Sequence, residues 1–172
     1  MNHKIFREYD IRGVADRDLD DALVRKLGMA LATHLRPDEG APTLVVGRDC
    51  RLTSPRLFEA LTGGMRACGA RVIDIGVVPT PLLYFAAHQL SPDGAVIITG
   101  SHNPSQDNGF KMLRGTSSIY GDEISALKER ILAEDFAVQD EAGPIEPRDL
   151  LAAYLAHAES TLQLGSKRPK VV

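Results

Sequence analysis

Three short runs of aliphatic residues constrain the fold of this chain more than any other feature. The runs are residues 43–47, 71–76 and 94–99, and each is continuous, apolar and rich in β-branched side chains. Such runs are typical of strands that are buried on both faces of a parallel sheet. Because segments with helical spacing separate them, they predict right-handed crossovers between parallel strands. We therefore expect an α/β fold of three layers (α/β/α), with a mixed, mostly parallel sheet between helices.

The predicted helices have recognisable start and stop signals. Thr53 and Ser54 precede Pro55, which is typical of a helix start, and Gly69 fits the end of that helix. A second start signal, Thr-Pro, opens a helix predicted over residues 80–90. The spacing of apolar residues predicts further helices over residues 23–35, 124–132 and 148–162.

The segment after the third run is predicted to reverse direction. A polar loop covers residues 100–108, and Asn108-Gly109 is a strong turn signal. Residues 110–113 then predict an edge strand of the mixed sheet.

The last thirty residues indicate a domain boundary. Residues 143–147 contain two prolines and a glycine and interrupt the chain. Residues 165–169 resemble a linker, and residues 170–172 resemble the first half of another strand. We therefore expect a first domain over residues 1–147, with residues 148–172 forming a connecting helix and the first strand of a truncated second domain. The chain is then a fragment of a longer protein.

Composition excludes several classes of partner. The chain has 172 residues and a formal net charge of -3, so it has no bulk attraction for nucleic acids or for anionic membranes. No apolar run is long enough to span a membrane, and the first residues lack the apolar core of a signal peptide. Cys50 and Cys68 lack the spacing of a zinc site and are expected to be reduced thiols. These observations predict a cytoplasmic protein that binds neither nucleic acid nor membrane.

The candidate site is the loop after the third strand, because ligands of parallel α/β sheets bind beyond the carboxyl ends of the strands. Gly100 allows close backbone approach and an unusual dihedral angle. Ser101 offers a hydroxyl group, His102 a titratable imidazole, and Asn103 a side chain able to brace the turn before Pro104. A braced, exposed hydroxyl suits phosphoryl transfer, in which positioning and charge neutralisation do most of the work. From composition alone, a polar β-turn that uses Ser, Asn and Pro for local hydrogen bonding is the simpler interpretation.

Four motifs in order resemble those of one family. The loop Thr99-Gly100-Ser101-His102-Asn103-Pro104 resembles the phosphoserine signature of the α-D-phosphohexomutases, and residues 107–111 (DNGFK) resemble the stretch that follows it. Residues 6–13 (FREYDIRG) are similar to the amino-terminal motif of the bacterial phosphomannomutase/phosphoglucomutases in that family. Gly47-Arg48-Asp49-x-Arg51 also matches. The resemblance implies the fold of the family's domain I.

The resemblance also implies an activity. Ser101 matches a serine that is phosphorylated in the resting enzyme and exchanges its phosphoryl group with a hexose phosphate through a bisphosphorylated hexose. The enzyme is thus expected to interconvert hexose 6-phosphate and hexose 1-phosphate, of mannose, glucose or both. A Mg²⁺ ion would bridge to the phosphoserine oxygen, so that Ser101 is a metal ligand through its phosphate. The aspartates that complete that site belong to another domain, and no Asp-x-Asp-x-Asp loop occurs in this sequence.

Further residues take roles from the same resemblance. Lys111 matches a lysine near the phosphoserine, which stabilises charge or moves a proton and contacts substrate. Tyr9 and Arg12 match substrate-facing residues, and His102 is a candidate for proton movement. Each has a simpler interpretation, such as a solvated lysine or a histidine that braces its loop. Gly100, Asn103, Arg48, Asp49 and Arg51 are expected to support the loop, although the last three also suit a purely structural ion-pair cluster.

Three alternatives stay open. A phosphoglucosamine mutase is the nearest, although Gly100 and residues 9–13 favour the phosphomannomutase/phosphoglucomutase version. A serine hydrolase would need a Gly-x-Ser-x-Gly elbow, which Ser101 lacks. A non-catalytic phosphosugar-binding module is the alternative of another class. Because the substrate also needs the remaining domains of the same chain, the fragment alone is expected to be inactive.

Overall fold

The fold centres on one mixed sheet. The computed structural model describes residues 2–163, 165 and 170, and its seven strands form a sheet of order β1-β5-β4-β2-β3-β7, with β6 paired to β5. The strands are β1 (Ile11–Val14), β2 (Thr43–Arg48), β3 (Arg71–Val77), β4 (Gly94–Ile98), β5 (Asp107–Arg114), β6 (Ser117–Ser118) and β7 (Ile145–Pro147).

The three predicted buried strands are confirmed. β2 pairs in parallel with both β3 and β4, so β2 lies at the centre of the parallel part of the sheet. Every residue of β4 is buried, and Leu44, Val45 and Val46 of β2 are completely excluded from solvent. Two-sided burial explains why these strands read as continuous apolar runs rather than alternating ones.

The prediction of an edge strand at residues 110–113 is wrong about its place. β5 is antiparallel to β4 on one side and to β1 on its other side, so β1 forms the edge. The turn predicted at Asn108-Gly109 is also wrong, because both residues lie inside β5. A Cβ atom at position 109 would lie 2.4 Å from the carbonyl oxygen of Ile11, so this glycine permits close approach of β1.

Two edge strands escaped prediction because their sequences carry weak signals. β1 is four residues long and contains Arg12 and Gly13. β7 ends in Pro147, and it pairs in parallel with β3 only. A proline is tolerated at such a position because the edge of a sheet needs no donor there. The interruption predicted at residues 143–147 is therefore the outermost strand of the sheet.

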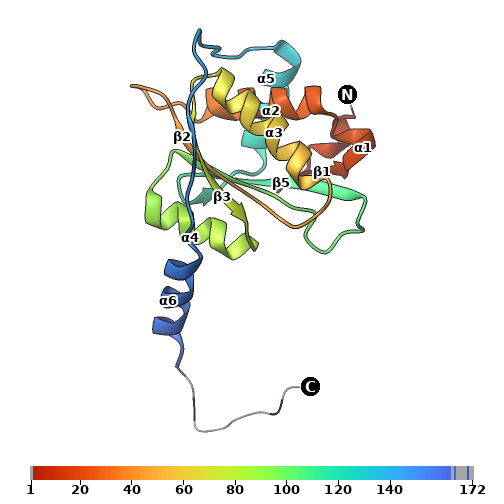
Figure 1. Ribbon diagram of the computed structural model, residues 1–172. Coiled ribbons are helices and arrows are strands. Elements are labelled where there is room, and N and C mark those ends of the chain that lie inside the picture. The colour runs from red at the N-terminus through yellow and green to blue at the C-terminus, as the bar shows by residue number, and fades with distance from the viewer. Residues whose placement is uncertain (1, 164, 166–169, 171–172) are drawn as a thin grey trace.

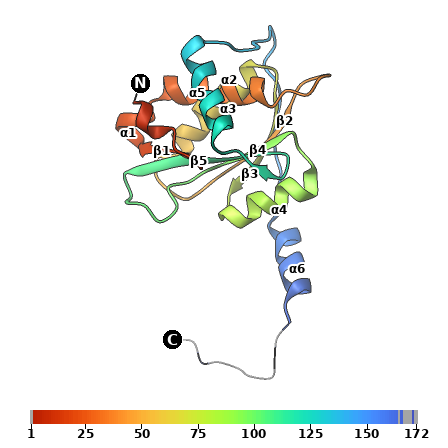
Figure 2. The same ribbon diagram turned by 180° about the vertical axis from the view of Figure 1, so that it is seen from behind.

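Helices cover both faces of the sheet, as the three-layer prediction requires (Figures 1 and 2). One face carries α2 (Asp21–His34), α3 (Ser54–Ala67) and α5 (Asp122–Ala133), and the other carries α4 (Thr80–Leu90). Two short helices, η1 (His3–Ile5) and α1 (Ala15–Asp18), flank β1. Each face has its own apolar core, because alternate residues of β2 and β4 point to opposite sides.

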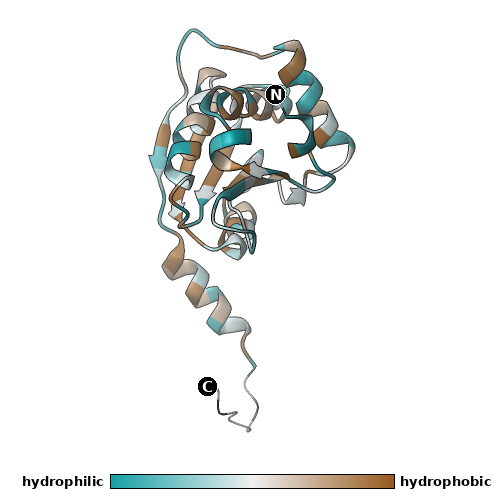
Figure 3. Cartoon of the chain, turned by 90° about the vertical axis from the view of Figure 1, so that its right-hand side faces the viewer, coloured by the Kyte–Doolittle hydropathy of each residue, from teal (hydrophilic) through white to brown (hydrophobic). Residues whose placement is uncertain are grey.

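The last helix projects away from this body (Figures 1 and 3). The helix predicted over residues 148–162 is confirmed as α6 (Leu151–Thr161), and it has no buried residue. The ring of Tyr154 in this helix packs edge-on against the ring of Phe85 in α4, and the two ring centroids are 5.5 Å apart. The domain boundary at 147/148 stays a prediction. The expected linker lies largely outside the described residues, and so do the last two residues of the expected strand.

Among the described residues, no helix combines the length and the apolar character that crossing a membrane would require.

Candidate functional site

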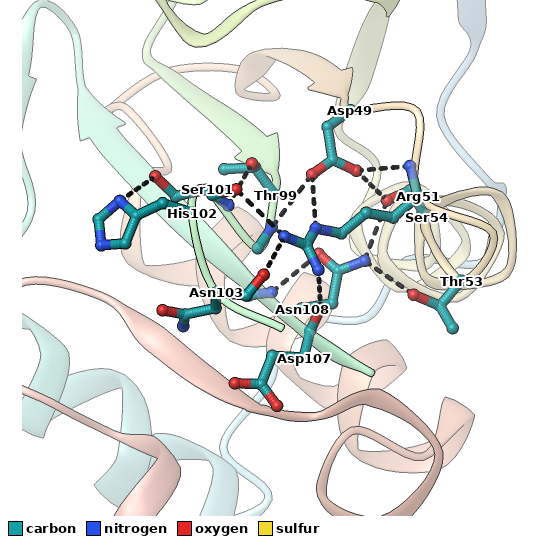
Figure 4. A network of polar contacts seen from close by, with 12 residues as sticks. Asp49, Arg51, Thr53, Ser54, Thr99, Ser101, His102, Asn103, Asp107 and Asn108 are labelled. Carbon is teal, nitrogen blue, oxygen red and sulfur yellow. Dashed lines mark hydrogen bonds and ion pairs between the residues drawn. The ribbon is translucent and has the colours of Figure 1, made fainter. Parts of the chain in front are cut away.

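The loop that carries Ser101 joins β4 to β5 at the carboxyl edge of the parallel strands (Figure 4). It borders an open cleft of about 790 Å³, which is large enough for a sugar phosphate. Residues of the serine loop, of the segments that follow β2 and β3, and of the starts of three helices line this cleft: Asp16, Asp49, Cys50, Arg51, Leu52, Thr53, Val78, Pro79, Thr80, Thr99, Ser101, Asn103, Ser105 and Gln106.

The guanidinium group of Arg51 holds this loop together. One terminal nitrogen donates to the carbonyl oxygens of Pro104 (2.6 Å) and Asp107 (3.0 Å). The other donates to those of Ser101 (3.1 Å) and Asn103 (2.7 Å). Its Nε faces the Asp49 carboxylate at 3.3 Å. All five N–H donors of Arg51 are therefore engaged inside the protein, and none is left for a ligand.

Asp49 anchors the same loop from the other side. Its Oδ2 accepts from the backbone N–H of Gly100 at 3.1 Å, and its Oδ1 accepts from the backbone N–H of Arg51 and the hydroxyl of Ser54. Burial alone would raise the pKa of this carboxyl. Hydrogen bonds from Ser54, from the Arg51 backbone, from Thr99 and from the Gly100 backbone outweigh burial and lower it. Asp49 is therefore ionised, and hydrogen bonds from other protein groups hold its carboxylate in place.

The sequence suggested that Gly100 provides both close backbone approach and an unusual dihedral angle, but in the structure Gly100 provides the first and Ser101 the second. A Cβ atom at position 100 would lie 2.3 Å from Cζ of Arg51, so the glycine makes room for the guanidinium. The unusual dihedral lies one residue later, at Ser101, where φ is 53°. This left-handed conformation is costly for a residue other than glycine and is often found at functional sites.

Asn108 is a site residue whose role sequence reasoning missed. Its side chain is fully buried, and its amide nitrogen donates to the hydroxyls of Thr53 (2.9 Å) and Ser54 (3.0 Å). The Thr53 hydroxyl makes no capping bond at the start of α3, although the sequence had suggested a cap there. The Asn-Gly pair was read as a turn signal, whereas here the amide ties β5 to α3 beneath the serine loop.

The reactive groups of the loop face outward (Figure 4). Ser101 Oγ is exposed and lies 3.3 Å from Nδ1 of His102. The backbone N–H of Ser101 donates to the hydroxyl of Thr99 at 2.9 Å. Asn103 supports the turn through its backbone, because its N–H donates to the Gly100 carbonyl at 3.0 Å. No described residue hydrogen-bonds its side chain, contrary to the role suggested for it.

Arg48 lies apart from the serine loop. Its guanidinium pairs with Asp74 of β3 at 2.9 Å and lies over the ring of Phe58, 4.2 Å from the centroid. The three charged residues of the Gly-Arg-Asp-x-Arg motif, Arg48, Asp49 and Arg51, therefore do not form one ion-pair cluster. Asp49 and Arg51 serve the loop, and Arg48 ties β2 to β3 and α3.

Lys111 lies in strand β5, and Arg12 lies in strand β1. Lys111 is partly exposed, pairs across the ladder with Ile97 of β4, and forms no ion pair with a described residue. Arg12 is opposite Gly109 and is paired with Asp10. Because positions 109 and 111 share one face of β5, Arg12 and Lys111 belong to the sheet face on which α4 lies.

Tyr9 lies in the turn before β1 and is 74% exposed. Its ring is tilted against that of Tyr120, with centroids 6.4 Å apart. The exposed ring is available for contact with a ligand.

The described residues offer no cluster of three or more histidine, cysteine, aspartate or glutamate side chains that would hold a metal ion. Asp49, the carboxylate nearest Ser101 in the loop network, is already occupied by five protein donors.

Comparison with known proteins identifies this arrangement. The family described as "Phosphoglucomutase/phosphomannomutase, alpha/beta/alpha domain I" matches residues 3–138. The phosphomannomutase/phosphoglucomutase of Pseudomonas aeruginosa PAO1 is 39% identical over 168 residues, which are 98% of this chain and 36% of that protein. A phosphoglucomutase of Neisseria meningitidis serogroup B is 38% identical over 96% of this chain and 35% of its own length.

A solved structure has the same fold. The crystal structure of a phosphoglucomutase/phosphomannomutase family protein from Burkholderia thailandensis superposes with a TM-score of 0.86 at 38% identity. The match covers 95% of this chain and 37% of that one, so this chain spans about a third of the length of the proteins it matches. The chain therefore belongs to the phosphoglucomutase/phosphomannomutase family, as its α/β/α domain I.

Proposed function

We propose that this chain is the phosphoserine domain of a phosphohexomutase, an isomerase that works by phosphoryl transfer. Ser101 would carry a phosphoryl group, give it to a hexose phosphate and take back the other phosphate of the bisphosphorylated intermediate. Hexose 6-phosphate and hexose 1-phosphate would thereby interconvert, with mannose, glucose or both as the sugar.

The observation that supports this proposal best is the way Ser101 is presented. Its hydroxyl is exposed at the edge of the cleft, while its backbone is fixed by Thr99 and by the Arg51 and Asp49 network. Phosphoryl transfer depends on holding the donor in line with the acceptor, so a rigid loop with an exposed hydroxyl suits it. His102 would receive or return the serine proton, and Arg12 and Lys111 would bind phosphate oxygens.

Magnesium belongs to the proposal, and a bound Mg²⁺ would neutralise charge on the transferring phosphoryl group. In this chain only the phosphate on Ser101 is proposed as its ligand. The other ligands, the choice of sugar and the second phosphate site are assigned to further domains of a longer protein. We place that protein in the cytoplasm, where the thiols of Cys50 and Cys68, unpaired here, would remain reduced.

Phosphopeptide mass spectrometry of the full-length enzyme that carries this domain tests the proposal. Active enzyme should contain phosphate on Ser101, and Ser101→Ala should remove it and lower mutase turnover by orders of magnitude. Ser117→Ala is the matched control, because Ser117 is an exposed serine of the short strand β6, which pairs with β5 far along the chain from the loop. Phosphate found only on another residue would refute the assignment. A non-catalytic module would bind phosphosugar without any turnover.

A further inference from the structure

Three polar side chains connect β5 and α3 to the backbone of the serine loop (Figure 4). Asn108 of β5 and Ser54, the first residue of α3, are both completely excluded from solvent. The Asn108 amide nitrogen donates to the Ser54 hydroxyl at 3.0 Å, and that hydroxyl lies 2.6 Å from Oδ1 of Asp49. Oδ2 of Asp49 accepts from the backbone N–H of Gly100, the residue before Ser101, at 3.1 Å. We call Asn108, Ser54 and Asp49 the loop anchor.

The orientation of the Asn108 amide fixes the direction of its hydrogen bonds. Its oxygen accepts from the backbone N–H of Gly109 at 2.9 Å, so its nitrogen is the atom that faces α3. The amide nitrogen carries two hydrogens, and it donates one to the Thr53 hydroxyl and one to the Ser54 hydroxyl. Because an amide nitrogen cannot accept, the Ser54 oxygen must be the acceptor in this bond.

The hydrogen of the Ser54 hydroxyl then has a single destination. A serine hydroxyl carries one hydrogen, and its bond with Asn108 uses only a lone pair of the oxygen. The ionised Asp49 carboxylate can only accept, so Ser54 donates its hydrogen to Oδ1 of Asp49. Every hydrogen bond of the loop anchor therefore runs from Asn108 toward Asp49, and no other arrangement of the hydrogens satisfies all three side chains.

This direction determines how Asp49 is presented to the serine loop. Its Oδ1 accepts from the Ser54 hydroxyl and from the Arg51 backbone, and these two bonds hold the carboxylate against rotation. Oδ2 therefore stays toward the Gly100 N–H. Gly100 is bonded directly to Ser101, whose φ of 53° is a conformation that a looser backbone would relax. The position of the Ser101 hydroxyl thus depends on Ser54, through Asp49 and Gly100.

We propose that Ser54 is a positioning residue for phosphoryl transfer at Ser101, and that Asn108 directs the Ser54 hydrogen toward Asp49. The inference rests on the proposed function for the reaction, whereas the restraint on the loop does not depend on it. In the transfer, the bond between phosphorus and the Ser101 oxygen breaks, a bond from phosphorus to a sugar hydroxyl oxygen forms, and the sugar hydroxyl proton ends on the serine oxygen. A displacement of about 1 Å from the in-line geometry can reduce such a rate about 10²-fold. The competing explanation is that Ser54 and Asn108 only fill the space between α3 and β5.

Kinetics of the full-length enzyme that carries this domain separate the two explanations. Ser54→Ala should lower kcat about 10-fold to 100-fold, while KM for glucose 1-phosphate stays within about twofold because the buried Ser54 cannot touch the substrate. Ser54→Thr keeps the hydroxyl and should stay within about threefold of the parental kcat. Thr62→Val is the matched control, since Thr62 is another buried residue of α3 and its hydroxyl donates to the Phe58 carbonyl of the same helix.

Asn108→Asp tests the direction of the hydrogen bonds. Aspartate has nearly the same shape as asparagine, but an ionised carboxylate has no hydrogen to donate. The Ser54 hydrogen would then be shared between two carboxylates, and kcat should fall at least as far as in Ser54→Ala. Near-parental kcat in Asn108→Asp would contradict the role proposed for Asn108.

Hydrogen exchange of the same full-length proteins gives a readout that needs no turnover. Peptides that cover residues 99–104 should exchange about tenfold faster in Ser54→Ala, because the acceptor of the Gly100 N–H is held less firmly. Thermal melts show whether each variant is folded. If Ser54→Ala does not fold, Ser54→Cys keeps the shape of the side chain with a much weaker donor and is read in the same way.

Several outcomes would overturn the proposal. Near-parental kcat in Ser54→Ala or an equal loss in Thr62→Val would do so, and so would a raised KM at unchanged kcat. Faster exchange over α3 with the loop unchanged would leave Ser54 a merely structural residue. A Ser54→Thr variant that melts like the parent and is as slow as Ser54→Ala would also contradict it. Absence of phosphate on Ser101 in the active parent would defeat the proposed function, while the exchange result would still decide whether Ser54 holds the loop.

Discussion

Arg51→Lys is the substitution that most directly tests how the serine loop is held. Lysine keeps the positive charge but has three donors on one nitrogen, whereas Arg51 uses five donors that diverge in a plane. One ammonium group cannot reach four carbonyl oxygens and the Asp49 carboxylate together. The loop would therefore lose some of the hydrogen bonds that hold its carbonyl groups in place.

The expected magnitude follows from the number of bonds lost. A hydrogen bond to a charged group contributes about 1.5–3 kcal/mol, and at least two of the five are lost. The loop carbonyls lie near the surface, so water replaces part of that loss. We expect the loop to be destabilised by about 2 kcal/mol, which corresponds to about a 30-fold increase in its local opening.

Hydrogen exchange reports on that opening directly. The backbone N–H groups of Gly100, Asn103 and Asp107 donate within the loop network and serve as probes. Arg48→Lys is the matched control, because Arg48 forms a comparable ion pair with Asp74 outside the loop. Exchange at the three probes should rise in Arg51→Lys and stay unchanged in Arg48→Lys. Unchanged protection in Arg51→Lys, or an equal rise in both variants, would refute the reasoning.

Three further predictions follow from the site and the fold. Lys111→Met should lower turnover of the full-length enzyme by about 10²–10⁴-fold with a stability change within about 0.5 kcal/mol, measured by steady-state kinetics beside thermal melts; near-parental kinetics would make Lys111 an ordinary surface residue. The pKa of Asp49 is lower in the folded state than its ordinary value, so the ionised carboxylate stabilises the fold above the ordinary aspartate range, and this stabilisation is lost as the pH falls through the depressed pKa. Asp49→Asn has no carboxylate to protonate, so the free energy of unfolding, measured by thermal melts at acid pH, should fall less steeply in this variant than in the parent. The 172-residue chain should melt cooperatively by circular dichroism yet show no turnover in a coupled mutase assay with glucose 1-phosphate, Mg²⁺ and a bisphosphate activator. Turnover near that of a full-length relative would contradict the placement of essential groups in other domains.

The parallel core was predictable because its signals are local. Residues 43–47, 71–76 and 94–99 are apolar on both faces, and each precedes or follows a helix with its own start or stop residues. The two edge strands, β1 and β7, lack such signals. An edge strand is stabilised by its neighbour on one side only, and its residues need not be apolar.

The location of the candidate site was also predictable, because ligands bind beyond the carboxyl ends of parallel strands and the serine loop follows one of them. The roles of its supporting residues were not. Asn108 looked like part of a turn, and Arg48 looked like a partner of Asp49, because spacing along the chain does not show which strand lies alongside. Only pairing of β5 with β1 and β4 buries Asn108 next to the hydroxyls of α3.

Local sequence patterns predicted the α/β class, the parallel direction of the central strands and the loop that presents Ser101. These depend on periodicity and on residue types that act within a few positions. Only the three-dimensional structure shows that β1 is an edge strand and that Gly100 makes room for Arg51. Each of those facts joins segments separated by about fifty to about a hundred residues along the chain, and the energy that brings them together is contact energy, which no local pattern encodes.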